Sequence, residues 1–320
     1  MISRLSDDKS RAAIAASIER RRVDTQGLLF KTVLQTCLLI TLALLAVLLV
    51  TVALDSTDQL GTRLWDFLQG TLRSRSEDER LGIHQGMYGS LWIAIIVAVL
   101  AFPIGIGAAV YLEEYAPRNR FTAFIEVNIR NLAGVPSVVY GLLGLALLLN
   151  GQIFGLDRLT GGSSALSGGI TLAILVLPIV VITSGEAFRA VPTELREGAY
   201  GVGATRWEMV RTQVLPYAAP GILTGTLLSM SRAVGEAAPL ILVGAISGRL
   251  GDNPGLLDFS ALTDQFTALP IVITSWTMQS GRDAGFTAAA AAAIVVLLVF
   301  VLMMNSTAIL LRNRFEKKRG

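Results

Sequence analysis

Two ionisable residues lie in the middle of a long apolar run of this 320-residue chain. The run extends from Ala218 to Ile246, and its segment SRAVGEAAPL contains Arg232 and Glu236, four positions apart. On a helix this spacing places both side chains on one face, where they can form an ion pair. A charge at the centre of a bilayer costs about 2.5–3.5 kcal/mol, so charged residues within membrane spans usually mark a functional site. This pair is therefore the first candidate for chemistry.

The two side chains suit a site for an oxyanion. A guanidinium offers a planar fork of donors that matches a tetrahedral oxyanion. A carboxylate beside it would repel a fully ionised anion such as sulfate, but it could accept a hydrogen bond from a protonated one such as hydrogen phosphate. Pro239 has no N–H for the carbonyl of Gly235, so we expect the helix to be loosened where the charges lie. The alternative is a buried ion pair that only fixes the packing of helices.

Other kinds of chemistry have few residues to use. The chain has one cysteine, Cys37, and one histidine, His84, which excludes an intrachain disulfide framework and leaves little for histidine-rich metal sites or Ser/His/Asp catalysis. The sequence contains no G-x4-G-K-S/T stretch, the phosphate-cradling loop of many ATPases. We therefore expect no catalytic residue, no metal site and no cofactor, and any energy source must be another polypeptide.

Composition indicates an all-α, polytopic membrane protein. Hydrophobic residues make up 52% of the chain and charged residues 16%, and the mean hydropathy is +0.60, which is more apolar surface than a soluble domain can conceal. A helix of about 20 apolar residues crosses a bilayer. Six segments qualify as transmembrane helices: 30–54, 88–112, 132–149, 165–185, 218–246 and 285–311.

The distribution of lysine and arginine predicts the orientation of these helices. Cytoplasmic loops are enriched in positive residues, and 19 of the 27 lysines and arginines lie in segments on one side, against 7 on the other. Both termini are therefore expected in the cytoplasm. Residues 8–22 are expected to form a short helix there, and their basic end, Arg20–Arg22, to mark the membrane face. The N-terminus does not resemble a cleavable signal peptide, so the first helix is expected to be retained.

These assignments divide the chain into five parts. They are a cytoplasmic N-terminal segment (1–29), a first transmembrane helix (30–54), an extracytoplasmic loop (55–87), a core with five transmembrane helices (88–311) and a basic cytoplasmic tail (312–320). Within the extracytoplasmic loop, the run EDER at 77–80 is expected to be solvated. Tyr217 and Trp276 are expected in the interfacial belts, where such aromatic residues are enriched.

The cytoplasmic loop 186–217 has the features of two short helices joined by a glycine turn. Pro192 suits a first helical turn, the glycines at 201 and 203 suit a helix end, and Thr205 with Glu208 fits the capping box of a second helix. The loop also carries apolar and aromatic residues, namely Tyr200, Val202, Trp207 and Met209. Such residues indicate a surface that binds a partner; the alternative is that they lie along the membrane interface.

The spacing within this loop resembles the loop signature of ABC-transporter permeases, EAA-x3-G-x9-I-x-LP. The positions that match are Glu197, Ala199, Gly203, Leu215 and Pro216. Gly198 replaces the middle alanine, and Gln213 stands where the pattern prefers isoleucine. The resemblance implies that the loop is the coupling helix that fits a groove on a cytoplasmic ATPase. Gly203 would then allow the tight turn, and Glu197 would favour its helix and pair with a basic residue of the partner.

Other segments resemble one branch of that family, the phosphate-specific ABC permeases. SRAVGEAAPL looks like their fifth-span motif, while residues 89–116, 128–145 and 267–276 look like segments of their A-type subunit. GEAAPL and an ALP-x5-W segment favour this subunit over its C-type sister. The resemblance runs from about residue 88 to the C-terminus. It implies a type I ABC importer permease fold in the bacterial cytoplasmic membrane, a heterodimer with the sister permease, a cytoplasmic ATPase dimer and an extracytoplasmic phosphate-binding protein.

The sequence thus predicts a permease subunit that imports inorganic phosphate, with Arg232 and Glu236 on the substrate path and ATP hydrolysis supplied by a partner. One alternative is an ABC permease for another oxyanion, such as sulfate or molybdate. Another is an ion-gradient carrier or channel gated by the charged pair, which leaves the loop signature unexplained. Whether phosphate meets Arg232 directly, or the pair only gates its path, stays open from the sequence.

Overall fold

The fold is helical throughout the part of the chain that the computed structural model describes. The described residues are 25–317, apart from 151–159, 249, 252 and 256–257. They form no β-strand, and one isolated bridge joins Thr71 to Leu81. The expected helix at 8–22 and the basic run at 20–22 lie outside the described residues, as do residues 318–320 of the tail.

The chain divides into two units, Met1–Thr51 and Val52–Gly320. The first unit contributes most of α2 (Thr25–Asp55), whose 31 residues are enough to cross a bilayer. The second unit holds the remaining helices. In chain order these are α3 (Thr57–Thr62), α4 (Leu64–Gln69), α5 (His84–Val110), η1 (Tyr111–Tyr115), α6 (Arg120–Ala133), α7 (Ser137–Gly144), η2 (Leu145–Leu149), α9 (Ala165–Arg189), α10 (Thr193–Gly201), α11 (Arg206–Met209), η3 (Val210–Val214), α12 (Leu215–Gly235), α13 (Ala238–Leu242), η4 (Phe259–Leu262), α14 (Leu269–Gln279) and α15 (Gly285–Lys317).

Among the described residues, four helices are long and apolar enough to cross a membrane. They are α2, α5 continued through η1, α9, and α15 from Gly285 to Arg314. A fifth crossing is formed only if α6 and the α7–η2 helix count as one span, and these two are bent by 98° at the break between them. The chain is therefore a multi-pass membrane protein, but the expected count of six transmembrane helices is not confirmed.

Proline and polar residues account for both departures from the six expected helices. The expected third helix, 132–149, runs across Pro136, and the structure breaks there because the residue before a proline disfavours helical geometry. The expected fifth helix, 218–246, stops at Gly235, and the short α13 follows. Helix α12 also contains Pro220, several hydroxyl side chains and Arg232, which make it less apolar than the four helices above.

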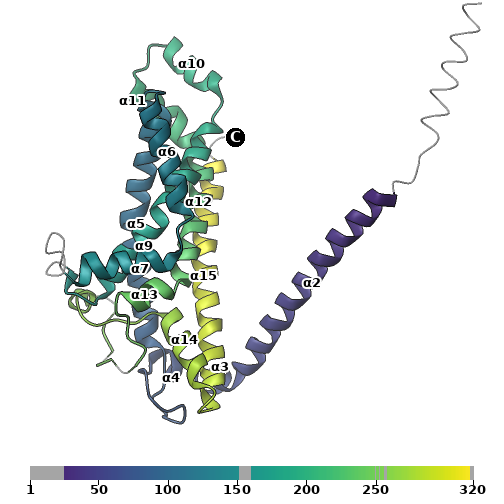
Figure 1. Ribbon diagram of the computed structural model, residues 1–320, viewed down its shortest axis with the longest axis vertical. Helices are drawn as coiled ribbons and strands as arrows, with labels where there is room; N and C mark the ends of the chain where they lie inside the picture. The colour runs from purple at the N-terminus through teal and green to yellow at the C-terminus, as the bar shows by residue number, and fades with distance from the viewer. Residues whose placement is uncertain (1–24, 151–159, 249, 252, 256–257, 318–320) are drawn as a thin grey trace, which may run out of the picture. The chain divides into compact units, whose positions relative to one another are not determined.

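Helices α5, α9, α12 and α15 run alongside one another and form the bundle of the second unit (Figure 1). Glycines let α5, α9 and α12 approach closely. A Cβ on Gly105 of α5 would lie 2.7 Å from a methyl carbon of Val180 on α9, and a Cβ on Gly225 of α12 would lie 2.3 Å from the hydroxyl oxygen of Thr183. Small residues at such contacts are typical of helix packing in membranes.

Different helices lie at the two ends of this bundle. Helices α10 and α11 lie at one end, and α3, α4 and α14 lie at the other (Figure 1). At the second end, the loop expected to span 55–87 is a folded segment that shares an apolar core with α14 and α15. This core contains Phe67, Leu72, Leu81, Ile83, Leu269, Val272, Trp276, Phe286, Ala289, Ala290, Ala292 and Ala293. Trp276 is 1% exposed, so its expected place in an interfacial belt was wrong; its ring packs against Phe67 and Phe286 instead.

Candidate functional site

Arg232 and Glu236 lie at the end of α12, where the helix stops inside an apolar segment. Arg232 is in the last turn, and Glu236 is the first residue beyond the helix, with extended backbone angles of φ −84° and ψ 119°. The expectation that both residues lie on one helix face was therefore wrong in its geometry. The expected effect of Pro239 is confirmed: it offers no N–H to the carbonyl of Gly235, and the helix ends at that glycine.

The two side chains still pair across the helix end. The Nε atom of Arg232 lies 3.6 Å from Oε1 of Glu236, and the side chains are 48% and 22% exposed. Within the residues that the structure describes, the guanidinium of Arg232 makes this one ion pair and no hydrogen bond. Most of its five donors are therefore available to another group.

Neighbouring helices hold the end of α12 in place. The hydroxyl of Ser231 donates a hydrogen bond of 2.9 Å to Oδ1 of Asn305 on α15. Beyond the break, α13 packs against α7 so closely that a Cβ on Gly141 would lie 2.8 Å from the Cα of Pro239. The break is thus a supported part of the fold, and it presents the charged pair in a fixed place.

The segment from Val191 to Val214 forms the expected hairpin at one end of the bundle, and we refer to it as the coupling hairpin. Its first helix, α10, follows Pro192, and Gly203 has a left-handed φ of +85°. Thr205 and Glu208 form the expected capping box at the start of α11. The hydrogen bonds that Thr205 donates to the Glu208 carboxylate lower the pKa of Glu208 below its ordinary value.

The second arm of the hairpin is longer than expected. Helices α11, η3 and α12 follow one another without a gap, so the arm leads directly into the helix that carries Arg232. The π-helical turn η3 lies where Pro216 leaves the carbonyl of Thr212 without its usual partner. A displacement of the hairpin can therefore reach Arg232 along one continuous helix.

The residues that match the loop signature take different positions on the hairpin. Ala199 is 9% exposed and belongs to the apolar cluster beneath the hairpin. Glu197 is exposed, and it makes no hydrogen bond or ion pair within the described part of the chain. Leu215 and Pro216 are exposed at the start of α12. The outward apolar residues include Tyr200, Val202 and Trp207, which are 47%, 86% and 60% exposed. The expectation that Met209 belongs to the same surface was wrong, because its side chain is 1% exposed and packs in the cluster beneath the hairpin.

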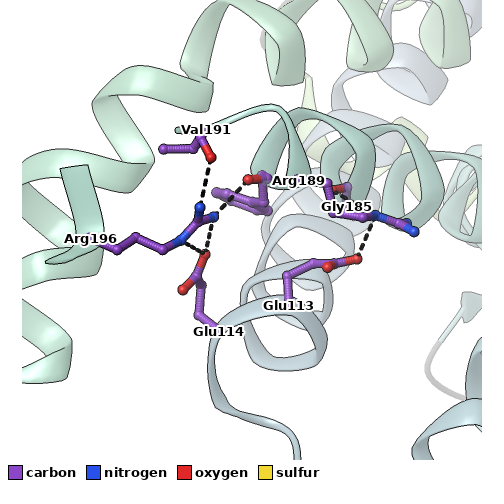
Figure 2. A network of polar contacts seen from close by, with 7 residues as sticks. Glu113, Glu114, Gly185, Arg189, Val191 and Arg196 are labelled. Atoms are coloured by element: carbon purple, nitrogen blue, oxygen red, sulfur yellow. Dashed lines mark hydrogen bonds and ion pairs between the residues drawn. The ribbon is translucent and has the colours of Figure 1, made fainter. Parts of the chain in front are cut away.

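Two neighbouring ion pairs lie at this end of the bundle, and one of them joins the hairpin to the ends of two membrane helices (Figure 2). The guanidinium of Arg196 on α10 donates to Oε1 of Glu114 at 2.8 and 3.2 Å, and to the carbonyls of Val191 and Phe188 at 2.7 and 2.8 Å. Beside it, Nε of Arg189 lies 3.1 Å from Oε1 of Glu113. Glu114 is 6% exposed, so removal of Arg196 would leave a buried carboxylate without its partner.

Comparison with known proteins decides the family. Residues 101–315 match the family described as the binding-protein-dependent transport system inner membrane component. This chain belongs to that family. The matched region contains the two ion pairs of Glu113 and Glu114, the coupling hairpin, and the charged pair at the end of α12.

Several named permeases are similar to this one in sequence. The phosphate transport system permease protein PstA of Mycobacterium leprae is 37% identical over 195 residues, which cover 60% of this permease and 58% of the relative. PstA 1 of Mycobacterium tuberculosis is 41% identical over 164 residues, or 51% of each chain. PstC 2 of the same species is 35% identical over 208 residues, or 58% and 63%. The matches to these relatives thus span about half to two thirds of their length.

Solved structures share the fold of this permease. A bacterial ABC transporter involved in the import of the acidic polysaccharide alginate aligns with a TM-score of 0.60 and 17% identity, over 88% of this permease and 97% of that chain. The MetNI methionine ABC transporter in inward-facing conformations aligns with a TM-score of 0.55 and 15% identity, over 73% and 95%. The fold is therefore that of an ABC importer permease.

The permease also contains functional candidates that the sequence did not single out. In the sequence, Glu114 lies within a segment that resembles the family, and Arg196 is one of the positive charges of a cytoplasmic loop. One available signal was their position, since two acids and two bases flank the ends of helices predicted to finish on the same side of the membrane. That signal does not predict which acid meets which base.

Proposed function

We propose that this chain is the A-type permease subunit of an ATP-driven importer of inorganic phosphate. The observation that carries the proposal is the guanidinium of Arg232. It lies where α12 stops within an apolar segment, and its donors make no hydrogen bond in the described part of the chain. Arginine in such a place suits a tetrahedral oxyanion, which accepts hydrogen bonds from the guanidinium fork. The similarity to permeases named for phosphate transport supports the same substrate.

Glu236 favours phosphate over anions without a proton. Its carboxylate lies within 3.6 Å of the Arg232 guanidinium, so an anion held by Arg232 also meets a negative charge. The P–OH group of hydrogen phosphate can donate a hydrogen bond to that carboxylate, whereas sulfate and molybdate carry no proton at neutral pH and are only repelled by it. Glu236 also limits the strength of binding, and a transport path must release what it binds.

The coupling hairpin is proposed to receive the force of ATP hydrolysis from a partner ATPase. Its contact surface is formed by the exposed aromatic and apolar side chains around Val202 and by Glu197, whose carboxylate is available to a basic residue. Gly203 and Ala199 shape the hairpin, and Leu215 with Pro216 begins the helix that leads to Arg232. The chain itself is not assigned any hydrolytic step.

The proposed assembly is a heterodimer with a sister permease, together with a cytoplasmic ATPase dimer and an extracytoplasmic phosphate-binding protein. We place the complex in the bacterial cytoplasmic membrane, with both termini of this chain and the coupling hairpin on the cytoplasmic side. The segment 55–87 then faces the outside, at the opposite end of the bundle from the hairpin. The five-part division drawn from the sequence remains our proposal for the domain boundaries.

Uptake by the native complex tests this function. The complex, purified from its own membrane and reconstituted into vesicles with its binding protein, should import radiolabelled phosphate only when ATP is supplied. An excess of unlabelled phosphate should abolish the signal, and an equal excess of sulfate or molybdate should not. Competition by sulfate as strong as that by phosphate would assign another oxyanion. Import without ATP would instead support an ion-gradient carrier or a channel.

A further inference from the structure

Arg196 has an unusually complete set of partners for a residue on a surface hairpin. Its guanidinium makes four hydrogen bonds, two to Glu114 and one each to the carbonyls of Val191 and Phe188 (Figure 2). Glu114 belongs to η1 at the end of the α5 span, Phe188 belongs to the last turn of α9, and Val191 follows α9 at the start of the hairpin. One side chain of α10 thus contacts the ends of two membrane helices.

The hydrogen bonds of Arg196 hold α10 in a defined orientation against η1 and the end of α9. Hydrogen bonds between charged groups are about twice as strong as neutral ones, and a cation at the C-terminal end of a helix also meets the negative end of its dipole. Glu114 is 6% exposed and Arg196 22%, so solvent screens the pair little. A displacement of α10 must therefore carry η1 and α9 with it or break these bonds.

Apolar packing holds the hairpin in place independently of the ion pair. Val191, Ala199 and Met209 of the hairpin are buried in one cluster with Phe188 at the end of α9. Such contacts are not directional, and they resist separation more than they resist sliding. The fold of the hairpin therefore does not depend on Arg196 alone, whereas the direction of its movement does.

We propose that the ion pair of Arg196 with Glu114 is the positioning contact that transmits movement of the coupling hairpin to α5 and α9. It acts beside the continuous α11–η3–α12 helix, so that three helices of the bundle respond to the hairpin together. Without the pair, ATP is still hydrolysed, but the movement of the hairpin is transmitted less completely to α5 and α9. The inference rests on the proposed function, because it requires an ATPase bound to the hairpin.

The neighbouring ion pair of Arg189 with Glu113 provides the matched control. It has the same charges and a similar distance of 3.1 Å, but Arg189 belongs to α9 and its side chain is 47% exposed. This pair joins η1 to α9 without involving the hairpin. Glu113→Gln therefore removes an ion pair at the same end of the bundle while the contact from the hairpin stays intact.

The test is the number of ATP molecules hydrolysed per substrate molecule imported by the reconstituted native complex. Glu114→Gln keeps the shape of the side chain and removes its charge, and we expect this ratio to rise about fivefold or more while the complex still co-purifies with its ATPase. Glu113→Gln should leave the ratio at the wild-type value. Should Glu114→Gln fail to assemble, Arg196→Lys is measured in its place, because lysine keeps the charge but lacks the planar fork that reaches both carbonyls and the carboxylate.

A double variant separates transmission from simple loss of stability. Arg196→Met alone leaves the buried Glu114 carboxylate without a partner, whereas Arg196→Met with Glu114→Gln removes that charge as well. The double variant should therefore be no worse coupled than Arg196→Met and should unfold at a higher temperature.

The outcomes distinguish this inference from the proposed function. A wild-type ratio in an assembled Glu114→Gln or Arg196→Lys complex, or an equal rise in Glu113→Gln, would overturn the inference while phosphate import by the wild type stands. If the wild-type complex imports a different oxyanion, the proposed function fails, and the ratio is then scored with that anion.

Discussion

The two arginines of the proposed transport route differ in how their donors are used. Arg196 donates hydrogen bonds to a carboxylate and two backbone carbonyls, whereas Arg232 makes one ion pair, at 3.6 Å, among the residues that the structure describes. A saturated guanidinium fixes structure, and an unsaturated one in an apolar segment can bind a passing anion. We therefore propose a positioning role for Arg196 and a substrate contact for Arg232.

A third polar contact, between Ser76 and Asp283, makes stability depend on pH. The Ser76 hydroxyl and backbone N–H donate to the Asp283 carboxylate at 2.5 and 3.0 Å, and the N–H of Gly285 donates at 3.1 Å. These hydrogen bonds hold the pKa of Asp283 below its ordinary value of 3.8. Their contribution is complete above that ordinary value and is lost as the pH falls through the lowered one.

Asp283→Asn should therefore lower the unfolding temperature at neutral pH. The difference in unfolding temperature between the variant and the wild type should become smaller as the pH falls. Thermal unfolding of the purified protein in detergent, followed from neutral pH downward, measures both effects. Ser76→Ala should show the same narrowing, because it removes a donor to the same carboxylate. A difference in unfolding temperature between Asp283→Asn and the wild type that is the same at every pH would show that this substitution acts through packing and not through the charge.

At the residue level, a contact could be predicted from the sequence where the surroundings made its residues conspicuous. Arg232 and Glu236 stand out because charges are rare in an apolar run, and their side chains form an ion pair at 3.6 Å, whereas their place on the substrate path stays a prediction. Glu114 and Arg196 are 82 positions apart, and charges at the ends of membrane helices are common. Their pairing follows from how α5, α9 and α10 pack, which no local pattern contains.

At the scale of elements, the coupling hairpin depends on one left-handed residue. Gly203 has φ +85°, and a Cβ there would meet no atom within 4 Å, so any cost of a side chain comes from the backbone conformation. We expect Gly203→Ala to destabilise the hairpin by about 1–2 kcal/mol and to weaken co-purification with the ATPase.

Gly201→Ala is the control for this prediction. Gly201 ends α10 with a helical backbone, and a Cβ there also meets nothing within 4 Å. Alanine is favoured over glycine in a helix by roughly 0.5–1 kcal/mol, so this variant should be as stable as the wild type or slightly more stable. Thermal unfolding and ATPase co-purification compare the two; equal behaviour of both alanine variants would contradict the role given to the turn.

Elements were predictable from the sequence where local chemistry decides them. The capping box of Thr205 with Glu208 and the interruption by Pro239 are local effects, and the structure contains both. The helix expected at 132–149 was placed across Pro136 because its apolar content outweighed the proline. Hydropathy does not report the π-helical turns or the continuity of α11 with α12.

At the scale of the whole molecule, the least predictable part is the segment from α3 to the start of α5. It carries few apolar runs, yet Phe67, Leu72, Leu81 and Ile83 are almost completely buried against α14 and α15. Its contact through Ser76 and Asp283 joins residues 207 positions apart. Short apolar stretches predict such a core only when the helices that pack against them are known. That the chain is a membrane protein, by contrast, follows from its composition alone.

The central claim is that Arg232 contacts the transported anion. The measurement that tests it most directly is the initial rate of phosphate uptake by the reconstituted complex carrying Arg232→Gln, with Ser231→Ala as the control that removes only a neutral hydrogen bond to Asn305. A lost hydrogen bond to a charged group is worth about 1.5–3 kcal/mol, so uptake by Arg232→Gln should fall about tenfold or more while the complex assembles normally and Ser231→Ala stays close to the wild type. Wild-type uptake by an assembled Arg232→Gln complex would contradict the claim and leave the pair a purely structural contact.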